Sequence, residues 1–256
     1  MSFLSELLDS TRARVAEARS LVSDEVLEQR VAAAKSPRGF HAALKGPRTA
    51  IIAEIKRATP SRGALNLELD PRKLAEAYRE GGAAAISVLT EPDRFKGSLE
   101  DLGGACEAGL PVLRKDFVVD PWQVFEARAW GADAVLLIVR INGDEFETLL
   151  KTTASLGMDA LVEVFDEADL ARAVDAGASL IGVNHRDLET FEVDPNRTEK
   201  LAGLVPEGTT LVALSGVSTR AEVEQLAAAG ADAVLVGESL VIAEDPAAKL
   251  RELMGG

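Results

Sequence analysis

The chain has 256 residues, of which 47% are hydrophobic, and this suits the core of one large domain or two small ones. Its formal net charge of −14 argues against a nucleic-acid partner, which would need a basic face, but allows a small anionic ligand in a locally basic cleft. A single cysteine excludes an internal disulfide, and no apolar run approaches the ~18 residues of a membrane span.

Residues 1–46 are predicted to form a helical extension. Apolar residues recur at spacings of three and four from Leu4, Leu7 and Leu8 onward, and a second helix is expected over residues 24–35. No strand precedes these helices, so we expect them to pack on the domain as a lid across one end. The N-terminus spreads its charges and has no apolar signal core, so a cytoplasmic protein is expected.

From residue 50 onward, short apolar runs alternate with amphipathic segments. The runs are residues 51–56, 84–89, 111–114, 133–139, 160–164, 179–183, 210–214 and 233–236. Strands that alternate with helices favour a parallel sheet, and the count of eight favours an α/β fold closed into a (β/α)8 TIM barrel. The whole chain, residues 1–256, would then be one barrel domain. An open doubly wound sheet is the rival, although no GxGxxG loop follows the first strand.

Capping residues mark the starts of the helices between these runs. The expected starts are Asp70-Pro71, Asp120-Pro121, Asp144, Asp166 and Ser218-Thr219. Most helices then end in glycine, and the junction into the next strand repeats as GGAAAISVL, GADAVLLIV, GASLIGVN and GADAVLVGES. We interpret this as a structural repeat, with glycine for the left-handed cap and small residues for close packing, and not as a ligand motif.

The first strand carries charges where a core strand would avoid them. Glu54 and Lys56 are two residues apart and therefore on one face, and a loop containing Thr59 follows. A solvated ion pair on an edge strand would also explain the pattern. In a parallel α/β fold, however, the C-terminal ends of strands are where the chemistry is placed.

Other strand ends add to this group. Lys115, Glu163, Asn184 and Arg186 follow or end the third, fifth and sixth strands, so two lysines and two glutamates are expected to converge on one cavity. Lysine and glutamate in an apolar barrel can have displaced pKa values, which suits proton transfer near neutral pH.

The last two strands end in a pattern that fits a phosphate site. Ser215-Gly216 and Gly237-Glu238-Ser239 leave little side chain in the way, and SLVIA is a candidate short helix whose N-terminal N–H groups bind an anion. Barrels commonly bind phosphate at strands seven and eight.

Three further residues are interpreted as structural. His41 and His185 are the only histidines, and without nearby cysteine or paired carboxylates they do not form a metal motif. His185 adjoins Asn184, so its side chain points to the other face, and we expect a rim or packing role. Cys106 lies in a helical segment and is expected to be an inert buried thiol.

The strand ends carry, in chain order, the motifs AEIKRATPS, LTEPDRFKGS, LRKDF, LVEV, GVNHRDL, SGVS and VLVGESL. Together they closely resemble the indole-3-glycerol phosphate synthase family of tryptophan biosynthesis. The resemblance covers nearly the whole chain, including SPRGFHAAL in the extension. It implies a carboxy-lyase that needs no cofactor or metal. The substrate would be 1-(2-carboxyphenylamino)-1-deoxyribulose 5-phosphate, whose ring carbon attacks the ketone before carbon dioxide and water leave.

The resemblance also implies roles for individual residues. Lys115 would be the general acid, and Glu163 would assist proton transfer in dehydration. Glu54 and Lys56 would orient the substrate and the catalytic lysine, and Asn184 would hold the anthranilate amine or a sugar hydroxyl. The remaining contacts would be substrate positioning by Thr59 and Arg186, phosphate binding by Ser215, Gly216, Gly237 and Glu238, and an apolar ring wall of Phe95, Phe117, Leu136 and Leu188.

One position departs from the family pattern, which reads AESG at the end of the seventh strand. Here the segment is ALSG, so Leu214 replaces a glutamate near the lysines. Loss of one member of a buried charged network predicts reduced activity, or a compensating carboxylate from elsewhere.

Two other readings remain beside the synthase. The first is another phosphate-binding barrel, such as the phosphoribosylanthranilate isomerase type, although no cysteine ends a strand here. The second is a binding-only barrel that has lost turnover because of Leu214. The oligomeric state is open, with a monomer as the expectation because the acidic sequence shows no long apolar patch.

Overall fold

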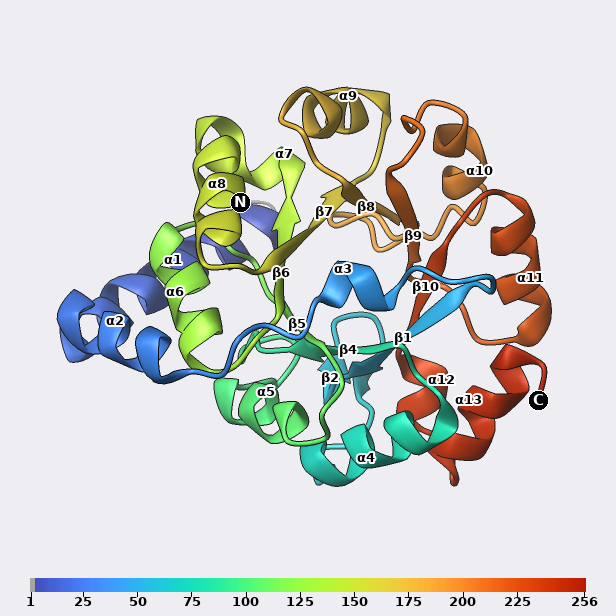
Figure 1. Ribbon diagram of the computed structural model, residues 1–256, viewed down its shortest axis with the longest axis horizontal. Helices are drawn as coiled ribbons and strands as arrows, with labels where there is room; N and C mark the ends of the chain where they lie inside the picture. The colour runs from blue at the N-terminus through green and yellow to red at the C-terminus, as the bar shows by residue number, and fades with distance from the viewer. Residues whose placement is uncertain (1–2) are drawn as a thin grey trace.

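The computed structural model describes residues 3–256, and its centre is a closed barrel of eight parallel strands (Figure 1). β1 pairs with both β4 and β10, so the ring closes and the open doubly wound alternative is wrong. The barrel strands are β1 (Ala50–Ile55), β4 (Ala85–Leu89), β5 (Val112–Lys115), β6 (Ala134–Ile138), β7 (Asp159–Val164), β8 (Leu180–Asn184), β9 (Thr210–Leu214) and β10 (Ala233–Val236).

Helices surround this ring and connect successive strands (Figure 1). Those after the extension are α4 (Pro71–Gly81), α5 (Leu99–Cys106), α6 (Pro121–Ala129), α7 (Val139–Asn142), α8 (Phe146–Ser155), α9 (Glu167–Asp175), α10 (Arg197–Ala202), α11 (Arg220–Ala228), α12 (Glu238–Val241) and α13 (Pro246–Met254). A short hairpin of β2 (Ala58–Thr59) and β3 (Gly63–Ala64) interrupts the loop after β1. The hairpin, α10 and α13 were not predicted.

Alternation along the strands separates two apolar cores. Ile52, Leu113 and Leu161 belong to a cluster that fills the barrel, while neighbours such as Ile51 and Val162 pack outward in a second cluster with the helices. Because aromatic residues are only 4% of the chain, both cores consist mainly of alanine, valine, leucine and isoleucine. The same alternation decides which polar residues at the strand ends point inward.

The predicted caps are confirmed with one exception. Asp70, Asp120, Asp166 and Thr219 each accept a backbone N–H at the start of a helix. The exception is Asp144, which lies in a 3-10 turn over Gly143–Glu145, and α8 begins after it without a side-chain cap. The φ of +44° at Gly143 turns the chain just before this segment, so the helix starts later than the aspartate predicts.

The junction repeat has a structural role, as predicted. Gly82, Gly131, Gly177 and Gly230 all have positive φ, which glycine adopts without steric cost. The aspartate of the two GADAV junctions accepts a hydrogen bond from the neighbouring strand. Asp133 accepts the N–H of Val112, and Asp232 accepts that of Leu211.

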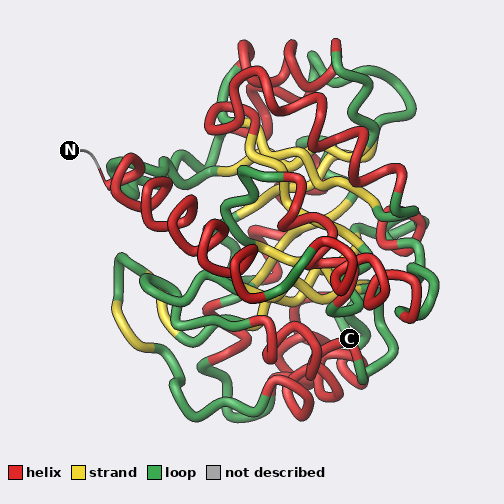
Figure 2. The backbone as a smooth tube through the Cα atoms, turned by 90° about the vertical axis from the view of Figure 1, so that its left-hand side faces the viewer, coloured by secondary structure: helices red, strands yellow, loops and turns green. Residues whose placement is uncertain are grey.

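The extension is helical as predicted and consists of α1 (Phe3–Leu21), α2 (Asp24–Ala33) and α3 (Phe40–Ala43); residues 1–2 lie outside the described range. Figure 1 shows α3 across the middle of the ring of strands, where Phe40 and Leu44 join the apolar cluster inside the barrel. In Figure 2 the start of α1 lies on the left-hand side, the side of the β2–β3 hairpin. The extension therefore reaches both ends of the barrel, whereas the sequence predicted that it would lie across one end only.

Over residues 3–256, no helix combines the length and the apolar character that crossing a membrane would require. The longest helix, α1, contains arginine, aspartate and glutamate throughout its nineteen residues. Two of its apolar side chains, Leu7 and Val15, are buried against the rest of the protein.

Candidate active site

A cavity of about 660 Å³ opens at the C-terminal ends of the barrel strands. Every predicted site residue lies at its wall, some on the strands themselves and the others on the segments that follow them. These are Glu54, Lys56, Thr59, Phe95, Lys115, Phe117, Leu136, Glu163, Asn184, Arg186, Leu188, Ser215, Gly216, Gly237 and Glu238. The grouping of these residues at one end of the barrel is thus observed, while their individual roles remain predictions.

Glu54 and Lys56 form a buried ion pair at the end of β1. Lys56 Nζ lies 2.9 Å from Glu54 Oε1, and Glu54 is only 3% exposed, so a solvated pair on an edge strand is wrong. A Cβ on Gly237, directly after β10, would stand 2.5 Å from Glu54 Oε1, so a larger residue there would require the Glu54 carboxylate to shift. Burial acts to raise the pKa of Glu54, but the charges of Lys56 and Lys115 outweigh it and hold the pKa below its usual value.

Glu163 on β7 is buried in a different setting. Its side chain is enclosed, and Oε2 has no hydrogen-bond partner among residues 3–256. Burial raises the pKa of Glu163, and the opposing influence of Lys115 and Asn184 is smaller. Two carboxylates in one cavity therefore have pKa values displaced in opposite directions, an arrangement that can hold one as a charge and use the other for proton transfer.

Lys115 is held in place by its neighbours in sequence. Asp116 is buried and accepts hydrogen bonds from Thr90 Oγ1 at 2.7 Å and from the N–H of Phe117 at 2.8 Å. Arg114 also pairs with Asp116, at 3.2 Å. Because both flanking side chains are fixed in this way, the lysine between them has a defined direction into the cavity.

Asn184 and Arg186 are linked by the turn that follows β8. Asn184 Oδ1 accepts the N–H of Arg186 at 3.0 Å, and Arg186 Nη1 donates to the carbonyl of Phe191 at 2.9 Å. These bonds hold both side chains at the cavity wall.

The expected phosphate end of the cavity is built from backbone. Ser215 and Gly216 both have positive φ, and α12 begins directly after Gly237. Ser239 Oγ is buried without a hydrogen-bond partner in the described part of the chain, and Ser239 lines the cavity although the sequence predicted no role of its own for it. Arg62, also missed, lies 2.5 Å from Glu238 Oε1 and connects the β2–β3 hairpin to the start of α12.

The apolar wall extends further than predicted. Phe3 and Leu4 from the first turn of α1 line the cavity, as does Phe191. The rings of Phe3 and Phe191 meet edge to face with centroids 4.8 Å apart, and the Arg94 guanidinium lies 5.3 Å from the Phe3 ring. The helical periodicity at the N-terminus predicts a buried face, but it does not indicate which end of the barrel that face covers.

The residues interpreted as structural lie outside this cavity. His185 Nε2 contacts Thr198 Oγ1 at 2.7 Å and is buried, which confirms the packing role. His41 Nε2 contacts Thr210 Oγ1 at the opposite end of the barrel. Cys106 Sγ donates to the carbonyl of Gly131, and burial raises the pKa of its thiol, which makes it a poor nucleophile at neutral pH.

Leu214 is buried in the apolar cluster inside the barrel, below the cavity wall. A Cβ on Gly182 would stand 2.7 Å from Leu214 Cδ1, so the leucine fills the space that this glycine leaves. Its neighbours in register are Asn184 and Leu235.

Comparisons with known proteins agree with this arrangement. The family model "Indole-3-glycerol phosphate synthase" matches residues 4–253. An indole-3-glycerol phosphate synthase of Parafrankia sp. is 52% identical over 96% of this chain and 92% of its own length, and one of Mycolicibacterium smegmatis is 49% identical over 98% and 93%. Among solved structures, thiamine phosphate pyrophosphorylase of Pyrococcus furiosus has a TM-score of 0.60 at 19% identity, covering 80% of this chain and 93% of that one, a likeness of fold alone.

Proposed function

The chain belongs to the indole-3-glycerol phosphate synthase family, and on that premise we propose that its cavity converts 1-(2-carboxyphenylamino)-1-deoxyribulose 5-phosphate to indole-3-glycerol phosphate. In this reaction an anthranilate ring carbon bonds to the ketone carbon. The carboxylate then leaves as carbon dioxide, and loss of the former ketone oxygen as water completes the indole. The cavity must therefore hold a phosphate and an aromatic ring, and it must supply protons in two steps.

Lys115 is assigned as the general acid that protonates the carbonyl oxygen as the ring closes. Glu163 is assigned to proton transfer in the dehydration, for which a pKa raised by burial above the usual range of a carboxyl is suited. The observation that carries the proposal is that these two groups face one cavity while a second carboxylate, Glu54, has its pKa held low by lysine. One cavity thus contains an acid, a group able to exchange a proton and a fixed negative charge.

The remaining residues are assigned to binding. Glu54 and Lys56 orient the substrate and Lys115, while Asn184 holds the anthranilate amine or a sugar hydroxyl. Thr59 and Arg186 position the substrate. The phosphate binds at Ser215, Gly216, Gly237 and Glu238, the last two through backbone N–H groups, and the ring lies against Phe95, Phe117, Leu136 and Leu188.

Indole fluorescence tests the assignment directly. The purified protein is mixed with the carboxyphenylamino-deoxyribulose phosphate, with no metal or cofactor added, and the indole signal is followed. We expect turnover by the natural chain and a loss of about a thousandfold or more in Lys115→Ala, within the range typical of a general acid. The relatives found do not support the binding-only alternative. Saturable binding of the substrate without any indole signal would be the evidence in its favour.

A further inference from the structure

The loop after β4 is wound around the carboxylate of Glu91, which is fully buried. Glu91 Oε1 accepts the N–H of Asp93 at 3.0 Å. Its Oε2 accepts the N–H groups of Arg94 at 2.7 Å and Phe95 at 3.0 Å. Three successive donors therefore converge on one side chain, and this fixes the backbone of Phe95, which lines the cavity.

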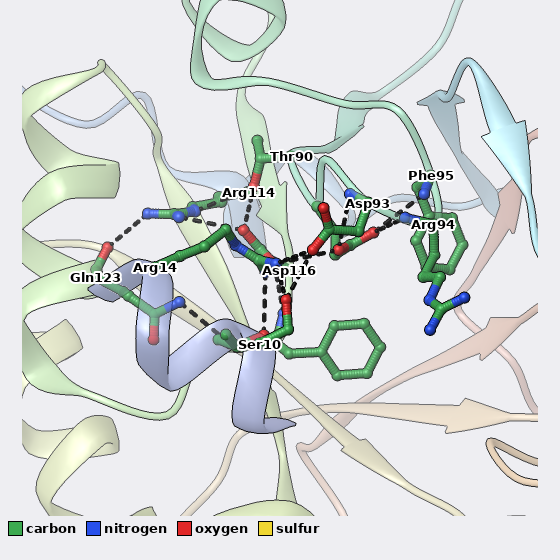
Figure 3. A network of polar contacts seen from close by, with 12 residues as sticks. Ser10, Arg14, Thr90, Asp93, Arg94, Phe95, Arg114, Asp116 and Gln123 are labelled. Atoms are coloured by element: carbon green, nitrogen blue, oxygen red, sulfur yellow. Dashed lines mark hydrogen bonds and ion pairs between the residues drawn. The ribbon is translucent and has the colours of Figure 1, made fainter. Parts of the chain in front are cut away.

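A cation from the N-terminal extension completes this arrangement. Arg14 on α1 places Nη1 3.4 Å from Glu91 Oε1 and 2.7 Å from Asp93 Oδ2. Ser10 Oγ donates to the same Asp93 oxygen at 2.7 Å, and Arg14 Nη2 donates to the buried Thr11 Oγ1 (Figure 3). Arg14 is the one basic side chain within ion-pair distance of Glu91 in the chain from residue 3 to 256, so the buried charge depends on α1 for its counterion.

The loop has little room to adjust by itself. Lys96 has a φ of +57°, and a Cβ on Gly97 would stand 2.0 Å from the carbonyl oxygen of Leu89, so the chain folds directly back on the end of β4. The carbonyl of Phe95 accepts the N–H of Ala58, which begins the β2–β3 hairpin. A shift of the Glu91 carboxylate would therefore move Phe95, and the hairpin that carries Thr59 would lose its anchor.

We propose that Arg14 is a positioning residue for the aromatic half of the substrate, acting through Glu91 and the backbone of Phe95. The helical extension then sets how tightly the ring is bound, in addition to packing on the barrel. The inference rests on the proposed function, because it takes the ring at Phe95 to be the anthranilate ring. It concerns binding that is equal in the ground state and the transition state, so its signature is a raised KM with an unchanged kcat.

Arg14→Met tests this, with Arg19→Met as the matched control. Arg19 lies on the same helix and pairs with Asp120 at 3.0 Å, but neither of these residues lines the cavity. We expect Arg14→Met to raise KM about tenfold with kcat within about twofold, and Arg19→Met to change neither. Arg14→Lys keeps the charge, and because Nη1 alone contacts both carboxylates a single ammonium group can replace it, so most of the lost affinity should return.

A binding measurement separates the ring from the phosphate and does not depend on turnover. The probe is the unreactive alcohol obtained by reducing the substrate ketone, compared with inorganic phosphate. Arg14→Met should weaken the alcohol about tenfold and leave phosphate unchanged. If Arg14→Met does not fold, Asp93→Ala removes the shorter of the two ion pairs of Arg14, and a KM rise of about threefold is expected.

Three results would overturn the inference. One is an equal KM in Arg14→Met and Arg19→Met, and another is a loss of kcat at constant KM. The third is equal weakening of the alcohol and of phosphate. A natural chain with no turnover would instead refute the proposed function, and the two failures are thereby distinguished.

Discussion

At the N-terminal end of the barrel, Asp133 is buried among donors, whereas at the C-terminal end Glu163 is buried with one oxygen unpartnered in the described chain. Asp133 Oδ1 accepts from the backbone N and Nε of Arg38, and Oδ2 accepts from Val112 and lies 2.7 Å from Arg38 Nη2. A buried carboxylate thus has hydrogen-bond partners for both oxygens at one end, whereas at the other end one oxygen has no partner in the described chain.

The difference follows from what covers each end. Phe40 and Leu44 of the extension close the N-terminal end, and Arg38 beside them supplies the charge that Asp133 needs. The C-terminal end stays open as the cavity that the predicted site residues line. On the proposed function, buried charge would serve stability at one end and chemistry at the other, as expected for a barrel whose active site lies at the C-terminal ends of the strands.

The largest effect is expected from Asp133→Ala. The change removes the partner of Arg38 and the acceptor of the Val112 N–H, so we expect the free energy of unfolding to fall by about 3 kcal/mol. Denaturant unfolding measures this loss, and kcat well below the melting temperature should stay within about twofold of the natural value. Asp232→Ala is the matched control, since within residues 3–256 the Asp232 side chain accepts the N–H of Leu211 alone, and its loss should cost about 1 kcal/mol.

A loss of turnover in Asp133→Ala at unchanged stability would contradict the assignment of Asp133 to stability alone. Such a result would mean that the N-terminal end communicates with the cavity. Equal destabilisation by Asp133→Ala and Asp232→Ala would contradict the importance of the Arg38 pair.

A smaller effect is expected from Glu163→Gln, which should lower turnover and raise stability. Turnover should fall about a hundredfold, which corresponds to about 2.7 kcal/mol of transition-state stabilisation. Stability should rise by about 1 kcal/mol, because a buried carboxylate with an unpartnered oxygen is replaced by a neutral group. Steady-state kinetics and denaturant unfolding on the same preparation measure both changes, and a loss of stability would show that Glu163 is held by contacts like those of Asp133.

The pH dependence sharpens this prediction. Because burial raises the pKa of Glu163 above 4.5, kcat should decline as pH falls through that raised value, and this limb should be absent in Glu163→Gln. The ionised form of Glu163 destabilises the fold, so the free energy of unfolding falls as pH rises through the raised pKa. Glu54 has the opposite sign, since its pKa lies below 4.5: it stabilises the protein above pH 4.5, and this stability is lost as pH falls toward the lowered pKa.

Local patterns in the sequence predict the strands and the wall of the cavity well. Each barrel strand lies within about two residues of its predicted range, because apolar runs bounded by glycine and aspartate specify both ends. Inward alternation then places Glu54, Lys115 and Glu163 in one cavity without any knowledge of neighbouring strands.

Contacts between distant segments could not be predicted in this way. Arg14 and Glu91 are 77 residues apart, and neither has a local pattern that names the other as its partner. The same holds for Phe3 and Phe191, whose rings meet only because the start of α1 reaches the cavity mouth. The late start of α8 depends on the turn at Gly143, which overrides the capping preference of Asp144.

The smallest effect is expected at Leu214, the last residue of β9, which is buried in the apolar cluster inside the barrel. Above it the cavity wall carries Lys56, Lys115 and Arg186, of which Lys56 is paired with Glu54. A further carboxylate at this level would add negative charge near Lys115 and Arg186, at the cost of burying a charge in an apolar layer.

Leu214→Glu should therefore raise kcat by up to about tenfold, equivalent to about 1.4 kcal/mol, while stability falls by a similar amount. Leu214→Gln is the matched control, because glutamine has nearly the shape and polarity of glutamate but carries no charge. Indole fluorescence under saturating substrate compares the three proteins. A gain in both variants would assign the effect to polarity, and a gain in neither would mean that the leucine is neutral and that the lysines need no third carboxylate. A gain in Leu214→Glu alone would show that charge balance limits the chemistry at the open end, whereas the closed end has already achieved it through Arg38 and Asp133.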